Sequence, residues 1–415
     1  GNDNTGTFSE TVGALSLLGG SNLVYSLDNN AASNTLTFGS FATRAVGSTL
    51  VFDTVTGTTA SGTIAFTAAP TQFNGIIGGW AIRSTSNDGN TLQLREWATM
   101  TGNVVTALAA GGYTATGTNT AASDGWLSTH NVKVNDASQT LTLGSRTIHS
   151  LNIQSTTGRS ITINSATAGD VNRTLIINSG GILSTQATHT IAGGKLTAGT
   201  HTNSLNPYEL IFHLPTNQLN VTSVITNNGA NAVSLVKNGS SVLDLNPSLS
   251  LSTSRTAGFI RVDMASSNNT AGLTVGAVVT GAGILPGTVV ESFNATQVFL
   301  SQAPITTGTS NLTYSLANTY TGKTYLNEGT LQITRESALG ANPGSFVADQ
   351  LIMNGGILRA TATFGFNSNR GITLGQADGF FRVANNQALT LSSTNVINGT
   401  GGRLFFAADA SSRGV

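Results

Sequence analysis

The feature that most constrains this chain is a succession of very short segments in which apolar and polar residues alternate. One of the clearest follows Gly329, where apolar Leu331 and Ile333 alternate with polar Thr330 and Gln332. A period of two places successive side chains on opposite faces of a β-strand. Short strands that glycine or asparagine separates are typical of the coils of a β-solenoid. The sequence therefore predicts an all-β fold, and specifically a right-handed parallel β-helix.

Glycine-containing turns recur together with these strands. Residues 177–183 (INSGGIL) match residues 353–358 (MNGGIL), and a Gly-Gly-x-Leu pattern is found again at 193–196 and 401–404. A tight corner needs a residue that tolerates positive φ, and the next strand must begin with an inward side chain. We therefore expect structural corner residues at Gly180, Gly181, Gly193, Gly194, Gly322, Gly329, Gly340, Gly355, Gly356, Gly401 and Gly402.

Residues 318–340 read NTYTGKTYLNEGTLQITRESALG. This pattern resembles the autotransporter-associated β-strand repeat, also called the passenger-associated transport repeat, of large secreted bacterial surface proteins. The match is close over this stretch and looser elsewhere. The resemblance implies a β-helix that is exported and displayed outside the cell, at the bacterial surface.

The spacing of these patterns predicts three parts. Residues 1–254 are expected to form solenoid coils, with a loop excursion around 70–127 where the rhythm breaks. Residues 255–316 have a different character and separate two halves of a repeat, so we expect a small inserted β-module there. Residues 317–415 are expected to continue the solenoid.

All three tryptophans, Trp80, Trp97 and Trp126, lie in or at the end of the excursion. One interpretation is an aromatic surface that contacts a sugar or a peptide. The other, which we favour, is that the rings pack against the side of the solenoid, because tryptophan is usually largely buried. Both interpretations remain open on the sequence alone.

Composition argues against several kinds of function. Only 9% of the residues are charged, Lys and Arg equal Asp and Glu at 18 each, and there is no cysteine. A neutral chain is a poor partner for nucleic acid or an anionic membrane, and it has no apolar run long enough for a membrane span. The acidic residues are dispersed and the histidines lack the spacing of metal ligands, so we expect no enzyme activity, no metal and no cofactor.

The sequence thus predicts an extracellular structural protein, a rod that forms or contributes to a cell-surface fibre or filament. Open solenoid ends expose backbone groups and core, so we expect self-association, with head-to-tail stacking of copies. One alternative is an adhesin-type passenger that binds glycans or other cell-surface proteins through the inserted module or the tryptophans. A second is a polysaccharide-active β-helix enzyme, which the scattered carboxylates disfavour.

Overall fold

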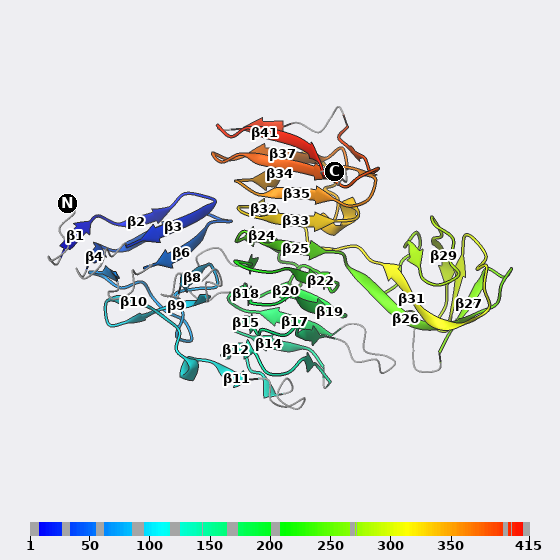
Figure 1. Cartoon of the computed structure of the whole chain (residues 1–415), viewed down its shortest axis with the longest axis horizontal. Coiled ribbons are helices and arrows are strands. Elements are labelled where there is room, and N and C mark those ends of the chain that lie inside the picture. Colours follow the sequence, from blue (N-terminus) through cyan, green and yellow to red (C-terminus); the bar gives the residue numbers. More distant parts are fainter. Residues whose placement is uncertain are drawn as a thin grey trace, which may run out of the picture.

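The computed structural model describes residues 8–26, 34–54, 62–84, 95–116, 125–142, 144–163, 173–200, 208–265, 270, 272–392, 397–399 and 401–409. It confirms the predicted fold class, because stacked parallel sheets build a β-solenoid of about 13 turns and 51% of the chain is strand. Figure 1 shows a central column of coils with one smaller unit on each side.

The central column, called the main solenoid below, is built from parallel sheets. Its first sheet has ten strands, in the order β11 (Thr114–Thr116), β12 (Asn131–Val134), β15 (Ser150–Gln154), β18 (Gly181–Thr185), β21 (Glu209–His213), β24 (Ser234–Asn238), β32 (Thr324–Leu326), β34 (Val347–Met353), β37 (Arg370–Leu374) and β40 (Ile397–Gly399).

The second sheet has nine strands, in the order β13 (Gln139–Thr140), β16 (Ser160–Thr162), β19 (His189–Ala192), β22 (Leu219–Val221), β25 (Val242–Leu245), β33 (Thr330–Ile333), β35 (Ile357–Ala360), β38 (Gly379–Val383) and β41 (Leu404–Ala408). The remaining side consists of β14 (Arg146–Ile148), β17 (Thr174–Ile177), β20 (Lys195–Ala198) and β23 (Val224–Ile225), followed higher up by β36 (Phe364–Gly365) and β39 (Leu389–Thr390).

The core of the main solenoid consists of columns of aligned side chains. Leu331 of β33 aligns with Leu243 in the coil below and with Leu358 in the coil above, and all three are fully buried. Thr330 and Gln332 on the same strand are only partly buried. The period-two alternation thus has the physical cause expected from the sequence, one strand face turned to the core.

The N-terminal unit, residues 8–107, forms short coils of its own. Parallel pairing joins β1 (Phe8–Val12) to β4 (Asn34–Phe38) and β7 (Thr63–Phe66), β2 (Leu15–Leu17) to β5 (Phe41–Arg44), and β3 (Ser21–Tyr25) to β6 (Thr49–Asp53) and β8 (Ala81–Ser84). The hairpin β9 (Arg95–Thr101) and β10 (Val104–Ala107) then pairs antiparallel with β8 and β7. In Figure 1 these coils descend beside the main solenoid, which then ascends.

The inserted module comprises β26 (Ser248–Arg255), β27 (Arg261–Met264), β28 (Val279–Thr280), β29 (Val290–Phe293), β30 (Gln297–Leu300) and β31 (Gly308–Ser315). These strands form one antiparallel sheet over a separate small core that includes Leu251 and Tyr314. The long β26–β31 pair connects this module to the main solenoid. Solenoid register is kept across the insertion, because β24 pairs directly with β32 and β25 with β33.

Candidate functional site: the flank contact and the open end of the solenoid

The expected corner glycines lie at turns and close approaches between coils. Gly180 has φ +73°, and a Cβ there would lie 1.7 Å from the carbonyl oxygen of Glu209 in the next coil. Gly329 has φ +67°, and its Cβ would lie 2.3 Å from the carbonyl oxygen of Gly239. Positive φ is also found at Gly193, Gly194, Gly340, Gly355 and Gly401, whereas Gly181, Gly322, Gly356 and Gly402 are positions where a Cβ would come within 3 Å of another atom.

The repeat-like stretch 318–340 connects neighbouring coils by buried polar contacts. The Asn318 side chain accepts a hydrogen bond from the backbone amide of Ile225 at 2.7 Å and donates one to the carbonyl of Ala338 at 2.7 Å. The buried Tyr320 hydroxyl lies 2.8 Å from the Thr324 hydroxyl. These residues therefore join the coil corner to its neighbours and lie inside the solenoid.

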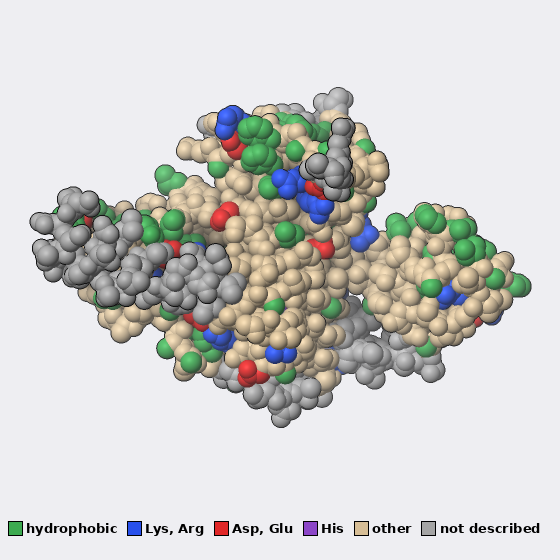
Figure 2. Space-filling model, in the orientation of Figure 1, with side chains coloured by type: hydrophobic (Ala, Val, Ile, Leu, Met, Phe, Trp, Pro, Cys, Tyr) green, Lys and Arg blue, Asp and Glu red, His purple; other side chains and the backbone are tan. Residues whose placement is uncertain are grey.

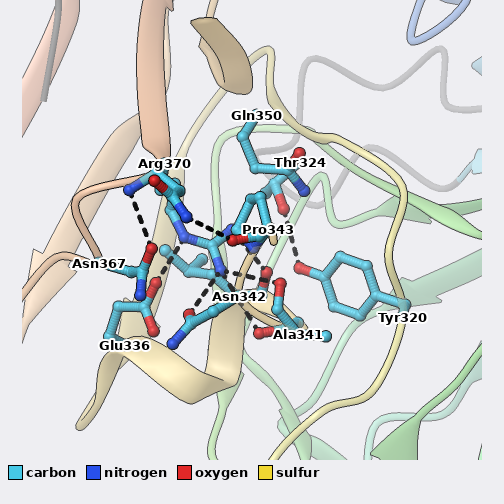
Figure 3. Close-up of polar contacts among 12 residues, drawn as sticks. Tyr320, Thr324, Glu336, Ala341, Asn342, Pro343, Gln350, Asn367 and Arg370 are labelled. Carbon is cyan, nitrogen blue, oxygen red and sulfur yellow. Dashed lines mark hydrogen bonds and ion pairs between the residues drawn. The ribbon is translucent and has the colours of Figure 1, made fainter. Parts of the chain in front are cut away.

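A buried arginine stabilises the corner that closes this stretch (Figure 3). The Nε of Arg370 donates to Glu336 at 2.5 Å, and Nη1 donates to the carbonyl of Leu339 at 3.0 Å. Glu336 and Leu339 form the ends of the short 3-10 helix η3 (Glu336–Leu339). The Arg370 side chain is fully buried, so its charge depends on this carboxylate and the surrounding carbonyl oxygens.

The N-terminal unit packs against the outer surface of the ten-stranded sheet, and we call this contact the flank contact. Ile211 and Val236 point outward from β21 and β24 and are buried against Leu17, Phe52 and Trp80 of the N-terminal unit. On β18, one coil below β21, Leu183 aligns with His213 and packs in a cluster with Trp97. These strands are therefore buried on both faces, by the solenoid core on the inside and by the N-terminal unit on the outside. A solenoid wall exposed to solvent would carry polar side chains on its outer face.

Gly181 allows the closest approach within the flank contact. A Cβ at Gly181 would lie 2.5 Å from the Cα of Gly79 and 2.7 Å from the ring of Trp97. Glycine at this position therefore lets the backbone of the N-terminal unit reach the coil. The sequence pattern indicated a corner at Gly181 and contained no sign of this second role.

Glu209 and Arg44 form a buried ion pair in the flank contact. Nη1 and Nη2 of Arg44 donate to Oε2 of Glu209 at 2.6 and 2.5 Å, and the amide of Gly47 donates to Oε1 at 2.5 Å. Burial raises the pKa of Glu209 to about 7, and the Arg44 charge and the Gly47 amide oppose that rise. Asn327 of the solenoid also donates to the carbonyl of Gly47, at 2.7 Å.

His213 is a second buried polar group between the two units. Its Nε2 lies 2.9 Å from the carbonyl oxygen of Gly79, which can only accept, so this nitrogen donates. The Asn238 amide lies 3.2 Å from the other ring nitrogen. Complete burial lowers the pKa of His213 to about 4, and the ring is neutral at neutral pH.

The three tryptophans are buried, which corrects the idea that they form an exposed aromatic platform. Trp80 stacks on Phe41 with 5.0 Å between ring centroids, and Trp97 lies edge-on to His213 at 6.0 Å. Trp126 belongs to the core of the main solenoid. Their large apolar surfaces fill the flank contact and the lower end of the core.

The upper end of the solenoid contrasts with its interior. β41 is the outermost described strand of the nine-stranded sheet. Phe406 aligns with the buried Phe381 and so occupies a core position, yet 63% of its surface is exposed. Figure 2 shows hydrophobic side chains near this end and on the inserted module, and near this end basic and acidic side chains lie beside them.

Among the described residues, the His, Asp and Glu side chains form no group of three or more that could hold a metal ion. Within the described part of the chain, no helix is long and apolar enough to cross a membrane.

No family model, curated protein or solved structure matches this chain. The class established by the fold is therefore the β-solenoid proteins. Membership of the autotransporter-associated repeat family remains an inference from the motif at 318–340.

Proposed function

We propose that this chain is an extracellular structural protein whose solenoid forms or contributes to a fibre at the bacterial cell surface. The observation that carries the proposal is the length of the parallel stack, in which one sheet alone has ten successive strands. The proposal includes no catalysis and no cofactor.

The length and regularity of the stacked coils support this role. Ten successive strands of one sheet stack in parallel, and buried ion pairs such as Arg370–Glu336 stabilise individual corners. A solenoid of this kind gives rigid length, and its uncharged polar surface avoids like-charge repulsion between neighbouring coils. The motif at 318–340 supports export to the surface.

The test is to label this chain with gold-conjugated antibody on intact cells and to examine them by electron microscopy. The proposal expects gold along surface fibres and loss of those fibres when the gene is deleted. Labelling only after the cells are broken open, or unchanged fibres in the deletion strain, would refute it. Cells expressing an unrelated secreted protein with the same epitope are the control.

An adhesin is the second candidate, because the inserted module exposes apolar side chains, notably Phe259, Val275 and Ile305. Deleting residues 248–315 and joining the chain with a short linker separates the two candidates, since solenoid register does not depend on this module. Lost adhesion with intact fibres favours the adhesin, and lost fibres favour a structural role for the module.

A further inference from the structure

A cavity lies where the inserted module joins the main solenoid. The four-stranded sheet on the remaining side of the solenoid stops at β23 (Val224–Ile225), and after β25 the chain leaves the column to form the module (Figure 1). Backbone hydrogen bonds fix both ends of the module to the coil below. The amide of Ser248 donates to the carbonyl of Thr222 at 2.9 Å, and the amide of Thr319 donates to the carbonyl of Ile225 at 2.8 Å. The cavity beside these bonds has a volume of about 220 Å³.

The lining of this cavity combines apolar side chains with hydroxyl groups. Leu249 and Leu316, from the two ends of the module, contribute apolar surface. Hydroxyl groups come from Thr222 of the solenoid and from Ser248 and Thr274 of the module. A hydroxyl group can both donate and accept hydrogen bonds, and an apolar side chain packs against C–H groups. Such a lining suits a small ring that carries hydroxyl groups at its edge.

Lys195 supplies the charge of the cavity, because it is the only charged residue among the described residues that line it. It follows the corner at Gly193 and Gly194, which have φ values of +67° and +50°. The next residue, Leu196, is buried in the solenoid core, so Lys195 lies on the outward face of β20. Among the described residues, no carboxylate forms an ion pair with its ammonium group. One unpaired cation favours a ligand with one negative charge.

We propose that this cavity binds an acidic sugar, a single uronic acid residue, with its carboxylate at Lys195 and its ring against Leu249 and Leu316. The inference goes beyond the structural role proposed above and does not depend on it. Sites for drug-sized ligands measure about 300–1,000 Å³, so this smaller cavity has room for one ring. A phosphate or sulfate group fits less well, because arginine forks or several backbone amides usually bind such groups and because neither has a ring to cover the leucines.

Binding of D-glucuronate to the full chain tests the ligand class, measured by isothermal titration calorimetry. A ligand of this size is expected to bind with a dissociation constant on the order of 1 mM. D-Glucose lacks the carboxylate, acetate lacks the ring, and sulfate has charge alone. Each of these three is expected to bind at least about tenfold more weakly than D-glucuronate.

Two variants locate the site. Lys195→Gln removes the charge and should weaken D-glucuronate binding at least about tenfold. Thr274→Phe keeps the lysine but adds bulk at an exposed position of the lining, and it should weaken binding by a similar factor. Lys323→Gln is the matched control, because this lysine lies on the outer surface of the same solenoid, is paired with Asp349, and does not line the cavity. It should bind as the wild type does, and the melting curves of all three variants show whether they are folded.

Three results would overturn the proposal. D-Glucuronate that does not bind at tens of millimolar, roughly ten times the expected constant, would exclude the site. Equal binding of D-glucuronate, acetate and sulfate would show that Lys195 attracts anions of any kind. Full binding by folded Thr274→Phe would place the ligand elsewhere, whatever happens in Lys195→Gln. A chain that binds D-glucuronate here but is absent from surface fibres refutes the proposed function and leaves the site standing, and a fibre protein that does not bind it gives the reverse result.

Discussion

Replacing Gly181 with alanine should separate the N-terminal unit from the solenoid and leave the coils folded. The new Cβ would lie 2.5 Å from the Cα of Gly79, whereas carbon atoms in contact need about 3.5–4.0 Å. The flank contact must therefore open by about 1 Å near Trp97. Overpacking of this size costs about 1–3 kcal/mol, and the cost falls on the contact because Gly181 itself has no positive φ.

Hydrogen exchange measured by mass spectrometry resolves this effect along the chain. A weakening of about 1–3 kcal/mol corresponds to about 5- to 150-fold faster opening. Amides of the N-terminal unit that the flank contact protects should exchange faster by this factor. Amides in β37 and β38, which lie several coils away from Gly181, should keep the wild-type rate.

Two other glycines provide the controls. Gly13→Ala adds a Cβ with no atom within 4 Å and should change nothing, whereas Gly180→Ala should disrupt the coil, since its φ is +73° and its Cβ would lie 1.7 Å from a backbone oxygen. Faster exchange spread evenly over both units in Gly181→Ala, or none anywhere, would show that the flank contact does not work as described.

Three further predictions concern buried groups. Arg370→Met should lower the free energy of unfolding by about 3–5 kcal/mol, measured by denaturant titration, because it leaves Glu336 without its partner. Trp126→Ala should cost about 3–5 kcal/mol by the same measurement, through a cavity in the lower core. His213→Gln should remove part of the acid sensitivity: the pKa of His213 is lowered from 6.5 to about 4, so wild-type stability is complete above pH 6.5 and falls by up to about 3 kcal/mol towards pH 4. Melting curves of the variant and the wild type across this pH range separate the effect of His213 from that of Glu209, because the raised pKa of Glu209 stabilises the fold as the pH falls. If the stability of both proteins changed with pH in the same way, His213 would not be the source of the acid sensitivity.

Period-two alternation was enough to predict the solenoid, because each strand turns one face to a continuous core. Leu331 and Ile333 are buried and Thr330 and Gln332 are not, as the pattern requires. The inserted module could be predicted because it separates two halves of one repeat, and the strands on either side of it, β24 and β32, do pair directly. Its sheet begins earlier than expected, at Ser248. Such features can be predicted from the sequence because they depend only on contacts between neighbouring coils.

The flank contact could not be predicted in the same way. Arg44 and Glu209 are 165 residues apart in the chain, and no local pattern connects them. One signal was present, however: Leu210, Ile211 and Phe212 are consecutive apolar residues, which indicates a strand buried on both faces. The burial of the tryptophans was the interpretation favoured from residue type, but the sequence did not indicate that Trp97 packs against the distant His213.

The antiparallel hairpin explains why the two parts of the chain lie side by side. Coils that kept stacking in one direction would carry the N-terminal unit to the end of a single rod. β9 and β10 instead pair antiparallel with β8 and β7, and the chain then enters the main solenoid alongside the coils it has just made. A hairpin cannot propagate a parallel coil, so it both ends the N-terminal unit and sets the position of the flank contact.

This arrangement changes how stability is distributed along the rod. In a simple solenoid each coil contacts only its neighbours, so stability is nearly additive along the chain. Here five successive strands of the ten-stranded sheet, β18 to β34, each carry one outward residue that packs in a hydrophobic cluster with the N-terminal unit. These residues are Leu183, Ile211, Val236, Tyr325 and Ile352. The flank contact thus couples these coils across the point where the module is inserted. β37 to β41 lie beyond these residues in the order of the sheet, so their stability depends mainly on stacking against neighbouring coils.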